Sequence, residues 1–170
     1  IAGNSSMTDP SGTTVTGKVG DGYARITFLG RTNNSPTNIS LSSSSVSENV
    51  AIGTTIGALS TTDPDSGDNH TYTLVSGTGD TDNASFTISG ANLLTNTALD
   101  YETKNSYSIV VQTSDGTATY SKTFTISVID TNSTPTNITL NPTTVNENVS
   151  LGTTIGALST TDPDSGDNHT

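Results

Sequence analysis

Three carboxylates stand close together at one place in the chain, and the same stretch returns 99 residues later. Asp63, Asp65 and Asp68 lie in DPDSGD, among a proline, a glycine and a serine. Acidic groups this close repel one another, and a bound cation relieves that repulsion. Calcium takes about six to eight oxygen ligands in flexible geometry, whereas magnesium keeps more of its waters. The stretch therefore predicts a divalent-cation site, with Ca²⁺ preferred.

Further acidic residues stand beside the predicted strands rather than within them. Glu48 lies in VSENV, Asp100 and Glu102 lie in LDYE, and Asp130 follows the last apolar run in VIDTN. LDYE places two acids together without turn residues that would explain them. We therefore assign Glu48, Asp100, Glu102 and Asp130 to metal binding.

Some of the acids have a simpler interpretation. Asp and Asn side chains cap their own backbone in turns, and Gly takes the positive φ that turns often need. For Asp68, Asp80 and Asp82 we favour this turn interpretation over metal binding. A lone His in each copy of the repeat, His70 and His169, is more typical of a surface residue than of a catalyst.

Composition excludes several classes of function. Five Lys and Arg stand against sixteen Asp and Glu, giving a net charge of −11. Nucleic acid and anionic membrane surfaces require basic patches, so neither is an expected partner. No apolar run approaches the roughly 20 residues needed to span a bilayer, so no membrane insertion is expected in this segment. We find no catalytic or phosphate-binding motif and expect no enzyme activity.

The chain contains no cysteine and therefore no disulfide. Only 29% of its residues are hydrophobic and 5% are aromatic, so the predicted core is thin and is built from Ile, Val and Leu. A secreted protein of this kind needs another means of stabilisation, and oxygen-rich sites for a hard cation would supply one.

An internal repeat organises the chain. Residues 35–71 align without gaps on residues 134–170, and residues 53–71 are identical to residues 152–170. A period of 99 residues is a domain length rather than a short structural rung. The sequence therefore predicts one complete repeat at residues 36–134.

The remaining residues fall into three parts. Residues 135–170 supply the first strands of a second, incomplete repeat, and residues 31–35 form a linker. Residues 1–30 lie outside the repeat and are interpreted as the C-terminal β-hairpin of a different, glycine-rich type of domain. Within that segment we expect strands at 13–18 and 23–29 around a Gly-Asp-Gly turn at 20–22.

Short alternating apolar runs separated by turn clusters predict strands throughout the complete repeat. Seven strands and no helical period indicate an all-β Greek-key sandwich. A generic Ig-like sandwich has the same pattern, although the Cys–Trp–Cys spacing of immunoglobulin domains is absent. The predicted strands are 37–41, 56–61, 70–75, 85–89, 92–95, 106–113 and 119–129.

The motifs SEN, DPDSGDN, LDYE, SDG and VID-N-P resemble, in order and spacing, the calcium-binding motifs of cadherin repeats. The resemblance is greatest to the cadherin-like tandem repeats of large bacterial surface proteins. It implies cadherin-like β-sandwich repeats in tandem, in which successive repeats share Ca²⁺ across their linker. The residues that match the upstream ligands are Glu48, Asp100, Glu102, Asp130 and Asn132, those that match the downstream pair are Asp162 and Asp164, and those that match the preceding junction are Asp63, Asp65 and Asp115.

Two departures from the family pattern reduce the expected calcium binding. The family's linker usually has a further Asp and Asn where this chain has Ser133 and Thr134. We therefore expect fewer ions or weaker binding than three ions per junction. The preceding linker has Arg31 at the position that corresponds to Asp130, so a full calcium cluster is not expected there.

The resemblance implies a non-enzymatic, secreted or cell-surface module that calcium makes rigid within a long surface protein or filament. Its expected partners are neighbouring repeats or other copies of the same protein, together with a glycan or other cell-surface partner. Two alternatives stay open at this point. One is a specific cell–cell or carbohydrate-binding adhesin domain, and the other is an accessory module of a large secreted enzyme.

Overall fold

The computed structural model describes residues 4–8, 14–18 and 32–164. The chain divides into two compact units, Ile1–Asn33 and Asn34–Thr170. In the first unit, β1 (Asn4–Thr8) pairs antiparallel with β2 (Thr14–Lys18). The strand predicted at 13–18 is confirmed as β2, whereas β1 was not predicted. The turn predicted at 20–22 and the strand predicted at 23–29 lie outside the described residues.

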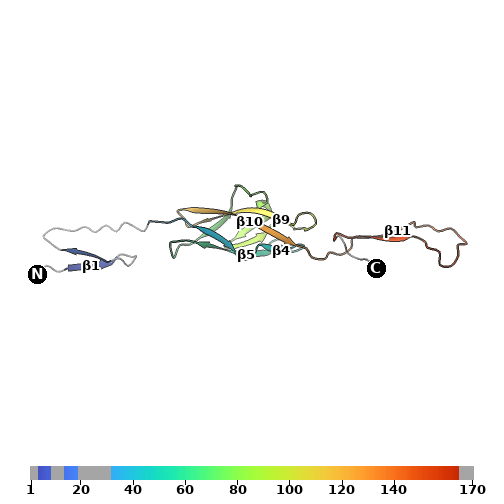
Figure 1. The fold of residues 1–170 in the computed structure, drawn as a ribbon, viewed down its shortest axis with the longest axis horizontal. Coiled ribbons are helices and arrows are strands. Elements are labelled where there is room, and N and C mark those ends of the chain that lie inside the picture. Colours follow the sequence, from blue (N-terminus) through green and yellow to red (C-terminus); the bar gives the residue numbers. More distant parts are fainter. Residues whose placement is uncertain (1–3, 9–13, 19–31, 165–170) are drawn as a thin grey trace. The chain divides into compact units, whose positions relative to one another are not determined.

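Two four-stranded sheets form the sandwich of the second unit (Figure 1). One sheet has the order β3-β5-β8-β7 and the other has the order β4-β10-β9-β6. Apart from the one-turn 3₁₀ helix Asn83–Ser85, the described residues of this repeat form strands and loops, which confirms the predicted all-β class. The strands are β3 (Asn38–Leu41), β4 (Ser45–Ser47), β5 (Thr55–Thr62), β6 (Thr71–Leu74), β7 (Phe86–Ser89), β8 (Asn92–Thr95), β9 (Ser106–Ser114) and β10 (Thr119–Ile129).

The core lies between the two sheets and follows the alternation of the sequence. On β10, Ile126 and Val128 are buried while Thr125 and Ser127 are exposed. Neighbouring side chains of a strand point to opposite faces, so this alternation places the apolar ones inside. The fully buried Ile39 of β3 belongs to the same hydrophobic cluster, together with Leu93, Leu99, Ile109 and Val111.

One pairing places the functional residues at a common end of the sandwich. β4 runs parallel to β10, and their last residues, Ser47 and Ile129, are partners in the register. Because the two strands point the same way, the residues that follow them emerge side by side. Glu48 and Asp130 are those residues, and the Glu48 N–H donates to the Ile129 carbonyl at 3.0 Å.

The second copy of the repeat begins with β11 (Asn137–Asn141) and β12 (Ala157–Thr161), which pair antiparallel. This pairing reproduces that of β3 with β5. The part of the chain described by the structure contains no helix long and apolar enough to cross a membrane.

Candidate metal centre

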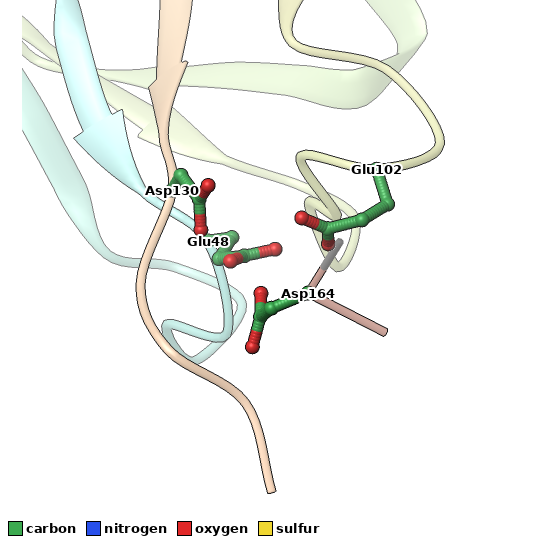
Figure 2. A group of neighbouring side chains, drawn as sticks. All are labelled: Glu48, Glu102, Asp130 and Asp164. Atoms are coloured by element: carbon green, nitrogen blue, oxygen red, sulfur yellow. The ribbon is translucent and has the colours of Figure 1, made fainter. Parts of the chain in front are cut away.

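Four carboxylates from four separate segments meet at the end of β10. Figure 2 shows the side chains of Glu48, Glu102, Asp130 and Asp164 pointing toward one another. One carboxylate oxygen from each residue lies within 4.8 Å of the others. We call this group the junction cluster, because Asp164 belongs to the second copy of the repeat and the other three belong to the complete repeat.

Glu48 is the buried member of the junction cluster, with 3% of its surface exposed. Its Oε1 accepts a hydrogen bond from the Thr131 N–H and its Oε2 accepts one from the Tyr101 N–H, both at 2.9 Å. These backbone donors, led by Thr131, hold the pKa of Glu48 below its ordinary value. The carboxylate is thus ionised and fixed in position by two of the segments that carry the other ligands.

The pKa of Glu102 is shifted in the opposite direction to that of Glu48 and lies above its ordinary value. Partial removal from water raises its pKa, and the negative charges of Glu48, Asp130 and Asp164 raise it further. This repulsion is what a bound divalent cation would relieve, because the cation would favour the ionised form of each carboxylate.

Asp164 is held by the linker between the repeats. The Ser133 N–H donates to Oδ2 of Asp164, and the Asp164 N–H donates to Oδ1 of Asp162 at 2.9 Å. The other oxygen of Asp164, Oδ1, is buried and receives no hydrogen bond from the described residues. A buried carboxylate oxygen without a donor is costly, and a cation ligand would satisfy it.

The junction cluster opens into a hollow whose remaining walls also carry oxygen atoms. Asn132, which the sequence predicted as a ligand, lines this hollow, and so does Asn105, which it did not. Asn105 stands three residues after Glu102 in the same loop, so its proximity to LDYE was the available signal. The full lining is Tyr101, Glu102, Asn105, Asp130, Asn132, Pro163 and Asp164.

Asn49 is a second residue that sequence reasoning did not single out. It adopts a left-handed backbone conformation with φ of 57°, and Asn148, its counterpart in the second copy, does the same with φ of 62°. The Asn49 N–H donates to the Leu99 carbonyl at 3.3 Å, and its Nδ2 donates to Oγ of Ser133 at 3.3 Å. Asn49 therefore connects the loop of Glu48 to the loop of Glu102 and to the linker.

Two predicted ligands make hydrogen bonds within their own turns instead. The two carboxylate oxygens of Asp100 accept from the N–H and the Oγ1 of Thr103, at 3.0 and 2.9 Å, and these bonds lower its pKa. Oδ1 of Asp115 accepts from the N–H groups of Thr117 and Ala118 in the β9–β10 hairpin, both at 2.7 Å. Neither belongs to a carboxylate group that the structure brings together as a metal site.

A second acidic group lies at the other end of the complete repeat. It contains Asp63 and Asp65, as predicted, together with Asp68, for which we favoured a turn. Its hydrogen bonds repeat those of the junction cluster, because the Asn34 N–H donates to Oδ2 of Asp65 at 2.5 Å. His70 Nε2 lies 3.1 Å from Oδ2 of Asp63.

The junction cluster fits Ca²⁺ on the chemistry of its donors. Four carboxylates, and the side-chain carbonyl groups of two neighbouring Asn residues, offer oxygen ligands, which suit a hard cation. Zinc would call for His or Cys ligands, and the cluster contains neither. The buried Oδ1 of Asp164 supplies an independent sign that a ligand belongs there.

The chain is similar to proteins of known family. The family model described as Cadherin domain matches residues 42–129, just over half of the chain. Protocadherin alpha-2 of Pan troglodytes and protocadherin alpha-2 of Homo sapiens are each 37% identical over 130 residues, which covers 71% of this chain. The chain spans only 14% of the length of these relatives.

Solved structures show the same fold. A protocadherin gammaB7 EC3-6 cis-dimer structure matches 78% of this chain and 32% of that chain, with a TM-score of 0.54 and 26% identity. Human protocadherin-24 EC1-2 matches 72% of this chain and 56% of that chain, with a TM-score of 0.58 at 22% identity. These matches confirm the predicted cadherin-like Greek-key sandwich. They point to eukaryotic protocadherins, so the bacterial origin stays a prediction.

Proposed function

Because the chain belongs to the cadherin domain family, we propose that it is an extracellular adhesive repeat module. Ca²⁺ bound at the junction cluster would make the connection between its repeats rigid. Proteins of this family are cell-surface adhesion proteins rather than enzymes. The observation that carries the proposal is the junction cluster, in which carboxylates of two successive repeats lie within 4.8 Å of one another. Such a group joins the repeats only if a cation offsets its repulsion.

The residues that would hold the ion differ in role. The charged oxygen ligands would come from Glu48, Glu102, Asp130 and Asp164. Neutral oxygen ligands would come from the side chains of Asn105 and Asn132. Bound Ca²⁺ would neutralise the four carboxylates and connect the segments that carry them. Asp162, the other predicted downstream residue, would also position Asp164, because its Oδ1 accepts a hydrogen bond from the Asp164 N–H.

We also propose that the junction binds fewer than three ions. Asp100 uses both carboxylate oxygens in its own turn, and the linker has Ser133 and Thr134 where the family usually has Asp and Asn. The preceding junction should bind less strongly still. In the sequence that precedes its acids Asp63 and Asp65, Arg31 stands at the position corresponding to Asp130.

Rigidity would follow from the short connection between the repeats. The segment 130–136, between β10 and β11, has no regular structure of its own. An ion that contacts Asp130 at the start of this segment and Asp164 after it would restrict the rotation of one repeat against the next. The ion would also stabilise the folded chain, because a ligand that binds only the native state shifts the folding equilibrium.

Calorimetric calcium titration of the full chain tests this proposal. We expect the wild type to bind Ca²⁺ and the Asp164→Asn variant to bind at least about tenfold more weakly, a difference of about 1.4 kcal/mol. Asp80→Asn is the matched control, because Asp80 accepts a hydrogen bond from the Gly77 N–H in a turn outside the junction cluster. Absence of binding by the wild type, or equal weakening by Asp80→Asn, would contradict the proposal.

Neighbouring repeats and other copies of the same protein are the partners we propose. The solved structure of protocadherin gammaB7 is described as a cis-dimer, which supports association between copies as a property of related chains. Light scattering of the full chain in Ca²⁺ and in EDTA tests this part. A calcium-dependent increase in mass is expected, and a monomer at all concentrations in both buffers would contradict it.

A further inference from the structure

The acidic loop DPDSG occurs in both copies of the repeat, and its two aspartates make the same hydrogen bond in each. The Asp65 N–H donates to Oδ1 of Asp63 at 2.8 Å, as the Asp164 N–H donates to Oδ1 of Asp162 at 2.9 Å. We call Asp63 and Asp65 the entry pair, because they follow β5 at the end of the complete repeat where β3 begins. Since the loop sequence is identical in the two copies, a difference between the two ends must come from residues outside the loop.

The linker residue beside the loop is such a difference. Asn34 and Ser133 stand 99 residues apart, and the backbone N–H of each donates to Oδ2 of the second aspartate of its loop. The Asn34 side chain adds a further bond, because its Nδ2 donates to Oδ1 of Asp65 at 3.3 Å. The Ser133 side chain has another partner, since its Oγ accepts from Nδ2 of Asn49 at 3.3 Å. Oδ1 of Asp164 stays buried without a hydrogen bond from the described residues.

The other aspartate of the entry pair also has a donor on its second oxygen. His70 Nε2 lies 3.1 Å from Oδ2 of Asp63, whose side chain is only 4% exposed. An ionised carboxylate only accepts hydrogen bonds, so Nε2 carries the hydrogen. Together with the bonds from Asn34 and from the Asp65 N–H, this gives every carboxylate oxygen of the entry pair a donor from the protein.

These donors lie where a cation would approach the entry pair. The Asn34 amide must present its NH₂ end to Asp65, because its carbonyl oxygen would be repelled by the carboxylate. A cation near Oδ1 of Asp65 would therefore meet the partial positive charge of the amide hydrogens and would have to displace them. The entry pair already has the positive ends of protein dipoles at the position where the junction cluster has an unsatisfied oxygen.

We propose that Asn34 determines calcium selectivity between the two ends of the complete repeat. Its side-chain amide takes the place of a cation at Asp65, whereas Ser133 leaves Oδ1 of Asp164 open to Ca²⁺. This selectivity rests on the proposed calcium binding at the junction cluster, and it adds the residue that withholds Ca²⁺ from the entry pair. The start of the complete repeat is then fastened to its acidic loop by protein donors alone.

A calcium titration of the full chain followed by ¹H–¹⁵N NMR tests the two ends separately. The backbone N–H signals of Thr131 and Ser133 report on the junction cluster, to whose carboxylates they donate. Those of Asn34 and Asp65 report on the entry pair in the same way. In the wild type, the junction signals should shift at a calcium concentration at least about tenfold lower than the entry signals require.

Substitutions at the two linker positions should change this order. Asn34→Ser should let the entry signals respond at a calcium concentration at least about tenfold lower than in the wild type, because Oδ1 of Asp65 loses its donor. Ser133→Asn should raise the concentration that the junction signals require by a similar factor, because an amide would then reach Oδ1 of Asp164. Asn96→Ser is the matched control and should change neither response. It removes an amide that donates to the Ala84 carbonyl at 3.0 Å, outside both acidic groups.

Four outcomes would overturn the proposal. These are equal calcium dependence of the two ends in the wild type, an entry response that Asn34→Ser leaves unchanged while Arg31 is still present, a junction response that Ser133→Asn leaves unchanged, or the same changes in Asn96→Ser.

A junction that does not respond to Ca²⁺ in the wild type would contradict the proposed function instead. Asn34→Ser decides the role of Asn34 in that case as well. A calcium response gained by the entry signals would support the role, and the absence of a gained response would refute it.

Discussion

Residues 38–62 and residues 137–161 form the same antiparallel pairing from nearly the same sequence, but only the first pairing lies in a core. The difference separates two contributions to this fold. Register, tight loop packing and the left-handed Asn after each Glu are local and occur in both copies. Burial comes from the segment 71–129, which packs against the first copy.

The largest expected contrast between the copies is at a core isoleucine. Ile39→Ala should lower the free energy of unfolding of the full chain by about 2–5 kcal/mol, because it opens a cavity at a fully buried position. Ile138→Ala should change it by no more than about 0.5 kcal/mol, because Ile138 is exposed. Urea unfolding measures the free energy of unfolding of both variants. A similar decrease in the two variants would contradict this contrast and show that the second copy contributes to the global unfolding transition.

A glycine pair should give a smaller contrast. Gly57→Ala would place a Cβ atom against the Ser43 carbonyl oxygen and should cost about 1–3 kcal/mol, because the backbone must move. Gly156→Ala meets the same obstacle at Pro142 but should leave the main unfolding transition unchanged. Urea unfolding of both glycine variants measures this contrast. An unchanged free energy of unfolding in the Gly57→Ala variant would contradict the close approach of the loop to β5.

Asp82 tests how the segment 71–129 is held together. Burial acts to raise its pKa, but hydrogen bonds from Lys104 and the Ser108 N–H outweigh this and leave the pKa below its ordinary value. A depressed pKa in the folded state adds stability above the unfolded pKa of about 3.9, and this stability is lost as pH falls through the folded pKa. In EDTA, Asp82→Asn should be less stable than the wild type at pH 7 by about 1–2 kcal/mol.

That difference should shrink as the pH is lowered below about 4. Unfolding curves at several pH values measure this difference, with Asp80→Asn as the control, because the Asp80 carboxylate accepts a hydrogen bond from the Gly77 N–H within its own turn. A pH-independent difference between the wild type and Asp82→Asn would show that its charge has no role.

The smallest contrast concerns Asn49 and Asn148, which both adopt left-handed φ. Asn49→Ala should destabilise the chain by about 1 kcal/mol through the cost of that conformation, and it should also weaken calcium binding, because the bond to Ser133 is lost. Asn49→Gly keeps the backbone freedom and should weaken calcium binding alone. Asn148→Ala should do neither, and a matching loss there would contradict the assigned role of Asn49.

Much of the fold could be predicted from the sequence, because alternating apolar residues specify strands locally. The predicted strands of the complete repeat correspond to β3 and β5 to β10. β4 was missed because Ser45–Ser47 is too short to show an alternation. Its parallel pairing with β10 is a long-range contact that no local pattern contains.

The candidate site was also predictable only in part, because long-range contacts that no local pattern contains bring its residues together. Glu48, Glu102, Asp130 and Asp164 were identified by type and by family resemblance, and the structure brings them together. The sequence could not show that Asp100 would bond to Thr103 instead, since a carboxylate beside Glu102 suits either role. The role of Asn49 depends on loop geometry that its residue type does not indicate, and the only signal for Asn105 was its proximity to LDYE.

The most direct test of the account is the melting temperature of the full chain in Ca²⁺ and in EDTA. A ligand at 100 times its dissociation constant adds about 2.7 kcal/mol to the native state, so calcium should raise the melting temperature and EDTA should reverse the rise. Asp164→Asn should lose most of this response. An identical melting temperature of the wild type in both buffers would contradict calcium binding at the junction.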